Sequence, residues 1–237
     1  DRAGGSRAVM KRLLPLLDSG ELTVTGKTIA ENYADATIFD SEVIRPLDHP
    51  VSSEGALYVL YGSLAPDGSI IKVGACDEKM RHFRGPARTF DSLEAAMAGL
   101  DAGEVQKGDV AVVRYLGPKA AFGTTAYVFQ KELKGRGLDK DVAIVTDGRF
   151  SGGSSGLSIG YISPEAGLCG PLALVKNGDM IDINLDERRL DLLVGEDEMA
   201  RRKGEWNWQF PGGDYPPFLR LFSKCAGSLA NGAVWEL

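Results

Sequence analysis

The sequence predicts an α/β fold: a closed or nearly closed β-barrel flanked by helices, with a helical and extended appendage at its N-terminus. From residue 57 onward, short apolar runs of strand length alternate with amphipathic stretches of helical period. With 237 residues and 43% hydrophobic composition, the chain is large enough to bury a substantial core. We expect residues 46–237 to form the barrel domain. Residues 1–45 are expected to be a connector, or a remnant of an N-terminal domain that is missing here.

The expected N-terminal elements are short. Residues 8–17 have the period of an amphipathic helix, which Pro15 kinks or ends. Residues 22–25 alternate like a strand, and residues 26–32 open a second helix. The stretch from 40 to 50 contains two turn signals with proline and is expected to be a connector.

The barrel region begins with a predicted hairpin. Residues 56–61 and 70–73 are apolar strands, and residues 66–68 (Pro-Asp-Gly) are expected to form the turn between them. His82 stands among arginines and is expected in a solvated charged loop. Periodicity and turn signals then predict helices at 91–103, 126–134, 196–203 and 218–226, and strands at 109–115, 142–145, 172–176 and 180–184.

Composition argues against several classes of partner and site. The formal net charge is −6 and there is no long basic run, so neither nucleic acid nor an anionic membrane surface is expected as a partner. No apolar run approaches the roughly 18 residues that span a bilayer. The three cysteines are scattered singly, which excludes a zinc ribbon and fits a reducing cytosol or organelle matrix. Two histidines are too few for a histidine metal cluster.

The most informative segment is the serine loop, residues 147–156. The apolar run 142–145 stops at Asp147 and opens into small residues that include Ser151, Ser154 and Ser155. A buried strand that delivers hydroxyl groups and free backbone N–H groups at its end can bind an anionic ligand. The alternative is a flexible Gly/Ser linker. The charged and aromatic residues within the loop, and the apolar sequence on both sides, favour the ligand site.

The motifs of the chain resemble those of the dihydroxy-acid and sugar-acid dehydratases, a family that includes phosphogluconate and aldonate dehydratases. The signature-like segment is Thr-Asp-Gly-Arg-Phe-Ser-Gly-Gly-Ser at 146–154. The resemblance covers nearly the whole chain. The other motifs stand in the family's order at 22–28, 45–47, 64–68, 84–87, 113–115, 117–119, 163–166, 170–175 and 177–179.

This resemblance implies a hydro-lyase that removes water from a branched-chain dihydroxy acid or a sugar acid and yields a 2-keto acid. It places the reaction in amino-acid biosynthesis or sugar-acid metabolism. The implied fold is the family's C-terminal swivelling domain, a β-barrel with flanking helices that closes over a larger N-terminal domain. The implied complete enzyme is a homodimer that uses an Fe–S cluster and Mg²⁺.

The resemblance also suggests site residues. Ser151 is expected to be the base that takes the C2 proton of the substrate. Arg149, Gly152, Ser154 and Lys119 are expected to bind the substrate. For Ser154 the alternative role is to cap a following helix, and for Lys119 it is that of a solvated turn residue. For Arg149 the alternative is to pair with a carboxylate of the protein.

The chain departs from the family where metals are concerned. The family holds its cluster with three cysteines, and its Mg²⁺ mostly with carboxylates and a modified lysine, of the N-terminal domain. Cys76, Cys169 and Cys225 do not lie in the cluster motifs. We therefore expect no metal ligand and no cofactor in this chain alone.

Two positions near the serine loop also differ from the family pattern. The segment after Gly-Pro-Lys normally leads to a glutamate that binds Mg²⁺, but here Thr125 or Ala126 stands at that position. Glu132 is the nearest acid along the chain, and Tyr161 replaces a frequent histidine.

Two hypotheses follow. In the first, the chain is the C-terminal part of a dehydratase, either a fragment or a subunit completed by another polypeptide, and is inactive alone. In the second, it is a catalytically silent binding or regulatory module that keeps the barrel and the serine loop. The complete serine loop favours the first hypothesis, and the missing glutamate favours the second.

Overall fold

The computed structural model describes residues 1–210 and 215–236, and it divides the chain into two compact units, Asp1–Gly55 and Ala56–Leu237. The sequence placed the expected boundary ten residues earlier, between 45 and 46. Among the described residues, no helix combines the length and the apolar character that crossing a bilayer requires.

The first unit contains two short α-helices. α1 (Gly5–Leu13) runs into a 3₁₀ turn (Leu14–Leu16) that contains Pro15, so the expected helix and its end at proline are both present. α2 (Ile29–Tyr33) begins with a capping box, in which Thr28 and Glu31 satisfy each other's backbone N–H groups. The strand expected at 22–25 is wrong. Only an isolated bridge from Leu22 to Thr28 forms there, because the segment has no neighbouring strand to pair with.

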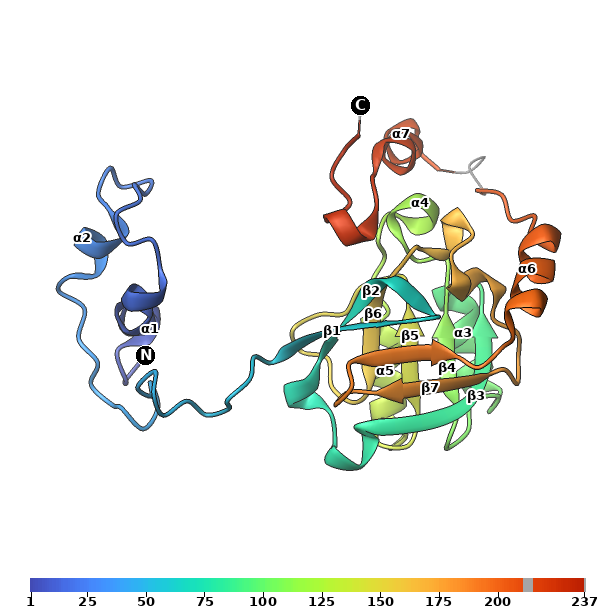
Figure 1. Ribbon diagram of the computed structural model, residues 1–237, viewed down its shortest axis with the longest axis horizontal. Coiled ribbons are helices and arrows are strands. Elements are labelled where there is room, and N and C mark those ends of the chain that lie inside the picture. The colour runs from blue at the N-terminus through green and yellow to red at the C-terminus, as the bar shows by residue number, and fades with distance from the viewer. Residues whose placement is uncertain (211–214, 237) are drawn as a thin grey trace. The chain divides into compact units, whose positions relative to one another are not determined.

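The second unit is a closed β-barrel with flanking helices, which confirms the predicted fold class (Figure 1). Around the barrel the strand order is β1-β2-β6-β5-β4-β3-β7-β8. The strands are β1 (Leu57–Gly62), β2 (Ala65–Lys72), β3 (His82–Phe90), β4 (Val110–Val113), β5 (Ala143–Thr146), β6 (Ser158–Ser163), β7 (Met180–Asn184) and β8 (Arg189–Leu192).

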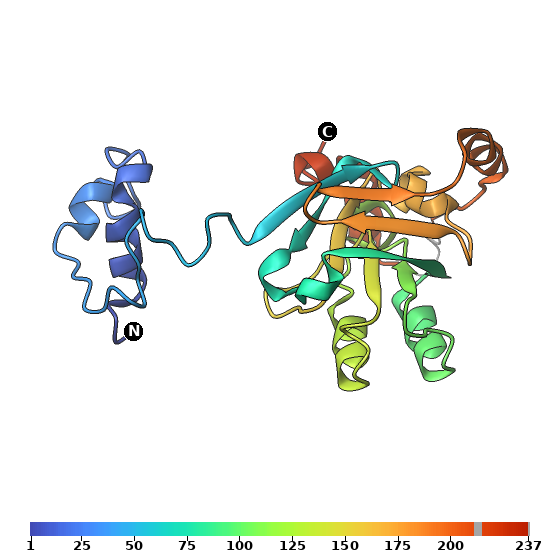
Figure 2. The ribbon, with the colours of Figure 1, turned by 60° about the horizontal axis from the view of Figure 1, so that its bottom comes forward.

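The middle of the barrel wall is parallel: β3, β4, β5 and β6 pair in that order. Parallel neighbours require crossover connections, and α3 (Leu93–Asp101) and α5 (Tyr127–Gly135) supply two of them. These helices extend on the same side of the barrel (Figure 2, green and yellow-green). Every residue of β4 and β5 is therefore buried, on one face by the barrel interior and on the other by the helices.

Several sequence expectations need correction. The hairpin of β1 and β2 exists, but its turn lies at residues 63–64, and residues 66–68 are part of β2. His82 begins β3 instead of lying in a loop. Residues 172–176 were expected to be a strand, but a 3₁₀ helix (Pro171–Leu174) begins there at proline, and its apolar residues are buried as a helical turn.

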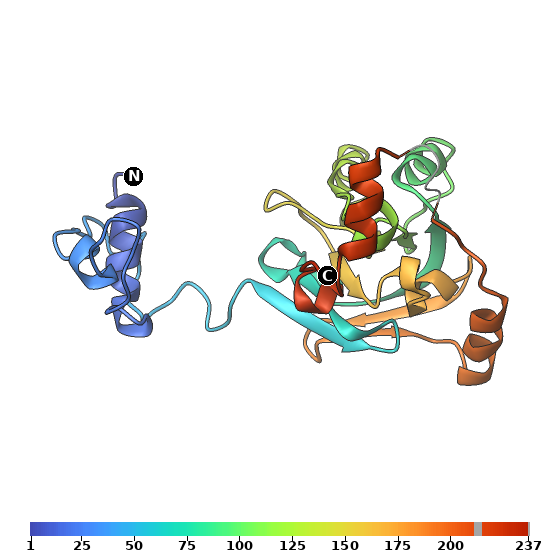
Figure 3. The same cartoon turned by 90° about the horizontal axis from the view of Figure 1, so that it is seen from above.

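The C-terminal helices agree with the prediction. α6 (Glu196–Glu205) and α7 (Pro217–Cys225) lie where the sequence placed them. α7 packs on the short helix α4 (Pro118–Ala121), as the view in Figure 3 shows. The Ser223 hydroxyl donates to the backbone carbonyl of Lys119, and the Lys119 ammonium donates to the carbonyl of Lys224 at 3.1 Å.

Candidate active site

The serine loop is anchored at its base by a buried carboxylate. Asp147, the first residue after β5, is fully buried. Its oxygens accept backbone N–H bonds from Tyr115 at 3.2 Å, Leu116 at 2.9 Å and Ala166 at 2.9 Å. One side chain thus ties the start of the serine loop to the segments that follow β4 and β6. The loop's position is fixed by buried hydrogen bonds.

A second buried carboxylate lies beside the first. Glu165 is 1% exposed, and both of its carboxylate oxygens accept the single backbone N–H of Lys119, Oε2 at 3.0 Å and Oε1 at 3.2 Å. A side chain at Gly117 would overlap this carboxylate, so glycine is required there by close approach. Burial raises the pKa of Asp147 to about 6. Burial, and next the charge of Asp147, raise the pKa of Glu165 to about 8.

The raised pKa of Glu165 predicts a pH-dependent stability. An acid whose pKa is raised in the folded state contributes its full stability below the pKa of the unfolded state, near 4.5. This contribution declines as the pH rises and is lost once the pH has passed through the folded-state pKa of about 8. Between pH 6 and 8.5 the free energy of unfolding should therefore fall, by on the order of 1–3 kcal/mol. The E165Q variant should show a much flatter profile, because its amide does not ionise. Urea unfolding followed by tryptophan fluorescence measures this.

The exposed Glu94 provides the matched control. The E94Q variant changes the net charge in the same way but leaves the buried pair intact, so its stability should fall with pH as in the parent chain. If the E165Q and parent profiles are parallel between pH 6 and 8.5, the buried Glu165 is not the group that titrates.

The remainder of the serine loop is held by short-range contacts. Ser151 is exposed, and its Oγ accepts the N–H of Gly153 at 3.2 Å. The ammonium of Lys72, the last residue of β2, donates to the carbonyl of Gly152. Ser154 is 6% exposed, and its Oγ makes no hydrogen bond to any residue that the structure describes. β6 follows the loop, so helix capping as the alternative role of Ser154 is wrong.

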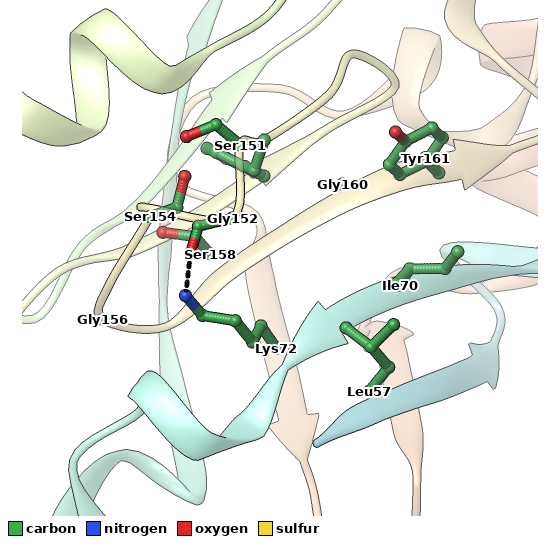
Figure 4. Close-up of a pocket in the computed structure, with 11 residues that line it drawn as sticks. Leu57, Ile70, Lys72, Ser151, Gly152, Ser154, Gly156, Ser158, Gly160 and Tyr161 are labelled. Carbon is green, nitrogen blue, oxygen red and sulfur yellow. Dashed lines mark hydrogen bonds between the residues drawn. The ribbon is translucent and has the colours of Figure 1, made fainter. Parts of the chain in front are cut away.

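A pocket of about 280 Å³ opens beside the serine loop (Figure 4). Its polar end is formed by loop and strand residues with hydroxyl, amide or ammonium groups, and its other end is apolar. No aspartate or glutamate is among the described residues that line it. The polar lining is Lys72, Ser151, Gly152, Ser154 and Ser158, and the remaining lining is Leu57, Ile70, Phe150, Gly156, Gly160 and Tyr161.

The structure brings some of the expected site residues together and separates others. Ser151, Gly152 and Ser154 line the pocket. Arg149 does not line it, because its Nε donates to the backbone carbonyl of Gly123. The ammonium of Lys119 is likewise directed to α7.

Sequence reasoning missed Lys72 and the apolar lining residues Leu57 and Ile70. Lys72 lies 80 residues from Gly152 in the sequence. The pairing of β2 with β6 brings it to the loop. A single lysine at the end of a strand carries no sequence signal for such a contact.

The residues at the family's Mg²⁺-ligand position and the three cysteines offer few metal ligands. The Thr125 hydroxyl donates to the carbonyl of Arg149 at 3.1 Å, and Ala126 is fully buried. Cys76, Cys169 and Cys225 are each partly buried. Within residues 1–210 and 215–236, no three histidine, cysteine or acidic side chains converge as metal ligands would.

Comparison with known proteins decides the family. Residues 42–233 match the family model described as "Dihydroxy-acid/6-phosphogluconate dehydratase C-terminal". The chain belongs to this family. The dihydroxy-acid dehydratases of Methanosarcina barkeri and Moorella thermoacetica are 50% and 45% identical to this dehydratase-family domain, over 99% and 100% of its length. That of Methanothrix thermoacetophila is 49% identical over 99% of it. The dehydratase-family domain spans 43% of the length of each of these relatives.

Proposed function

We propose that this chain forms the C-terminal part of a hydro-lyase that converts a 2,3-dihydroxy acid into a 2-keto acid. The observation that carries the proposal is the place of Ser151. Its hydroxyl lies at the polar end of the pocket, within the loop that Asp147 anchors, and receives the N–H of Gly153. The relatives at 45–50% identity named above are dihydroxy-acid dehydratases.

In the proposed reaction Ser151 removes the proton from C2. The electron pair of that C–H bond forms the C2–C3 double bond, and the C3–O bond breaks. The departing hydroxyl group takes up the proton that Ser151 has removed and leaves as water, which regenerates the base. The resulting enol tautomerises to the 2-keto acid. A serine alkoxide is a strong base but is hard to form at neutral pH, so it needs stabilisation. The N–H of Gly153 stabilises negative charge on Ser151 Oγ.

The Fe–S cluster and Mg²⁺ that the family resemblance implies do not fit the residues of this chain. The three cysteines do not converge, and Thr125 and Ala126 offer no carboxylate beside the serine loop. In this proposal the cluster and Mg²⁺ belong to an N-terminal domain or companion subunit of a homodimeric enzyme in the cytoplasm or an organelle matrix. The chain alone is then inactive.

The lining of the pocket favours a branched-chain dihydroxy acid over a sugar acid. Leu57 and Ile70 lie at the end opposite the loop serines (Figure 4). A sugar acid carries hydroxyl groups along its whole length and would leave several of them without partners at this end. A short branched aliphatic tail would be buried favourably there.

The second candidate is a catalytically silent binding module, which Thr125 and Ala126 favour because they remove a carboxylate next to the loop. The test is a 2-keto-acid assay after anaerobic reconstitution with iron, sulfide and Mg²⁺. The chain alone should give no product. Together with the polypeptide that supplies the rest of the enzyme, it should turn over 2,3-dihydroxy-3-methylbutanoate at least about 10-fold faster than gluconate in kcat/KM. A fully loaded assembly without turnover would establish the silent module instead.

A further inference from the structure

From the pocket geometry we infer that Lys72 binds the carboxylate of the acid that occupies this pocket, with Ser154 as its partner donor. The inference deepens the proposed function and rests on it for the kind of ligand. Lys72 is not part of the serine loop. It reaches the pocket from β2, and β6 lies between β2 and the β5 strand that leads into the loop; Figure 4 shows Lys72 directed to Gly152.

The ammonium group of Lys72 has N–H donors that are not used within the described part of the chain. An ammonium has three N–H donors, and the carbonyl of Gly152 accepts one of them. No other acceptor and no ion pair of Lys72 is found among the residues that the structure describes. The remaining donors and the positive charge are therefore free for an anionic group in the pocket.

A second, independent observation comes from Ser154. Its hydroxyl is buried in the pocket lining and makes no hydrogen bond to any described residue. Buried hydroxyl groups in folded proteins are nearly always paired, so Ser154 Oγ has a donor that a ligand oxygen in this pocket can accept. A carboxylate has two oxygens, and it can accept from Lys72 with one and from Ser154 with the other.

The charge balance of the pocket points to an acid. Lys72 is the one charged side chain among the described lining residues, so the potential in this pocket favours an anionic ligand. Arg149 and Lys119 bind backbone carbonyls elsewhere, so neither neutralises a ligand in this pocket. The contact to the ligand carboxylate is thus assigned to Lys72, in the β1–β2 hairpin.

The experiment is an NMR titration of the full chain with two probes, 3-methyl-2-oxobutanoate and its methyl ester. The parent chain should bind the acid about 10-fold more tightly than the ester. In the K72M variant this preference should disappear while the affinity for the ester stays unchanged. The K72R variant should retain most of the preference because it restores the charge, and S154A should lose a smaller part.

Lys134 offers a matched control. It also contacts the serine loop, through Ser155 Oγ at 3.2 Å, but does not line the pocket. The K134M variant therefore tests whether a lost lysine contact to the loop is enough to change binding, and it should keep the preference for the acid. The inference is overturned if K72M retains the preference, if K134M loses it equally, or if the parent chain binds both probes alike.

Turnover of the complete enzyme separates this inference from the proposed function. K72M should raise KM about 10-fold and leave kcat within about 3-fold, because the carboxylate contact is the same in substrate and transition state. If the enzyme has no turnover but K72M abolishes the preference for the acid, the proposed function fails and the Lys72 contact stands. If turnover is normal and K72M changes neither KM nor acid binding, only the Lys72 contact fails.

Discussion

Replacing Ser151 by alanine should lower kcat of the complete enzyme by about 10²–10⁴-fold, the range that a positioned base contributes. KM should change little, because in the proposed reaction Ser151 makes its decisive interaction only when the C2 proton is transferred. The hydroxyl is exposed at the polar end of the pocket, so alanine removes it without leaving a cavity in the core. The 2-keto-acid assay measures the loss.

Exchange at C2 gives a more specific measurement for the same variant. An enzyme that deprotonates C2 reversibly exchanges this proton with deuterated solvent, and the S151A variant should not. Ser155 is the matched control, since it is a serine of the same loop, bonded to Gln130 at 3.1 Å and outside the pocket lining. The S155A variant should keep kcat within about 5-fold. Comparable losses in S151A and S155A would mean that loop structure, and not a base at Ser151, explains the effect.

The fold could be predicted where the sequence pattern is local. The apolar run at 142–145 and the helical period at 126–134 correspond to β5 and α5, and their alternation indicated the barrel. β6 and β3 were missed for a physical reason. β6 follows a run of small residues, and β3 contains charged and glycine residues, so neither strand shows an apolar run. Both become strands because their neighbours in the barrel supply backbone partners.

In the candidate site, too, the residues of one local motif could be predicted, and the residue that arrives through long-range strand pairing could not. Ser151, Gly152 and Ser154 belong to one continuous motif, so a single loop delivers all three. Lys72 reaches them only through barrel closure, and no local pattern reports that contact. The prediction for Arg149 rests on its charge within the loop, and that for Lys119 on its place in the Gly-Pro-Lys turn. In the structure, nearby backbone carbonyls accept from both side chains instead.

Removing the carboxylate of Asp147 should cause the largest loss in the free energy of unfolding. In the D147A variant three buried N–H groups lose their acceptor at once. Each unpaired buried group costs about 1–3 kcal/mol, so the free energy of unfolding should fall by about 3–5 kcal/mol. Urea unfolding measured by tryptophan fluorescence at pH 7 provides the value. Asp67 is an exposed control, and D67A should change the same quantity by less than about 0.5 kcal/mol.

The D147N variant tests the geometry of these bonds and not only the presence of a polar group. Tyr115 and Ala166 donate to one oxygen of Asp147, and Leu116 donates to the other. An asparagine has one acceptor oxygen, so it can keep the first two bonds while its NH₂ group faces the N–H of Leu116. The loss should therefore be about 1–2 kcal/mol, between those of the parent chain and D147A. If D147N and D147A are equally destabilised, the negative charge of Asp147 matters more than its hydrogen-bond geometry. If neither is destabilised, the anchor of the serine loop lies elsewhere.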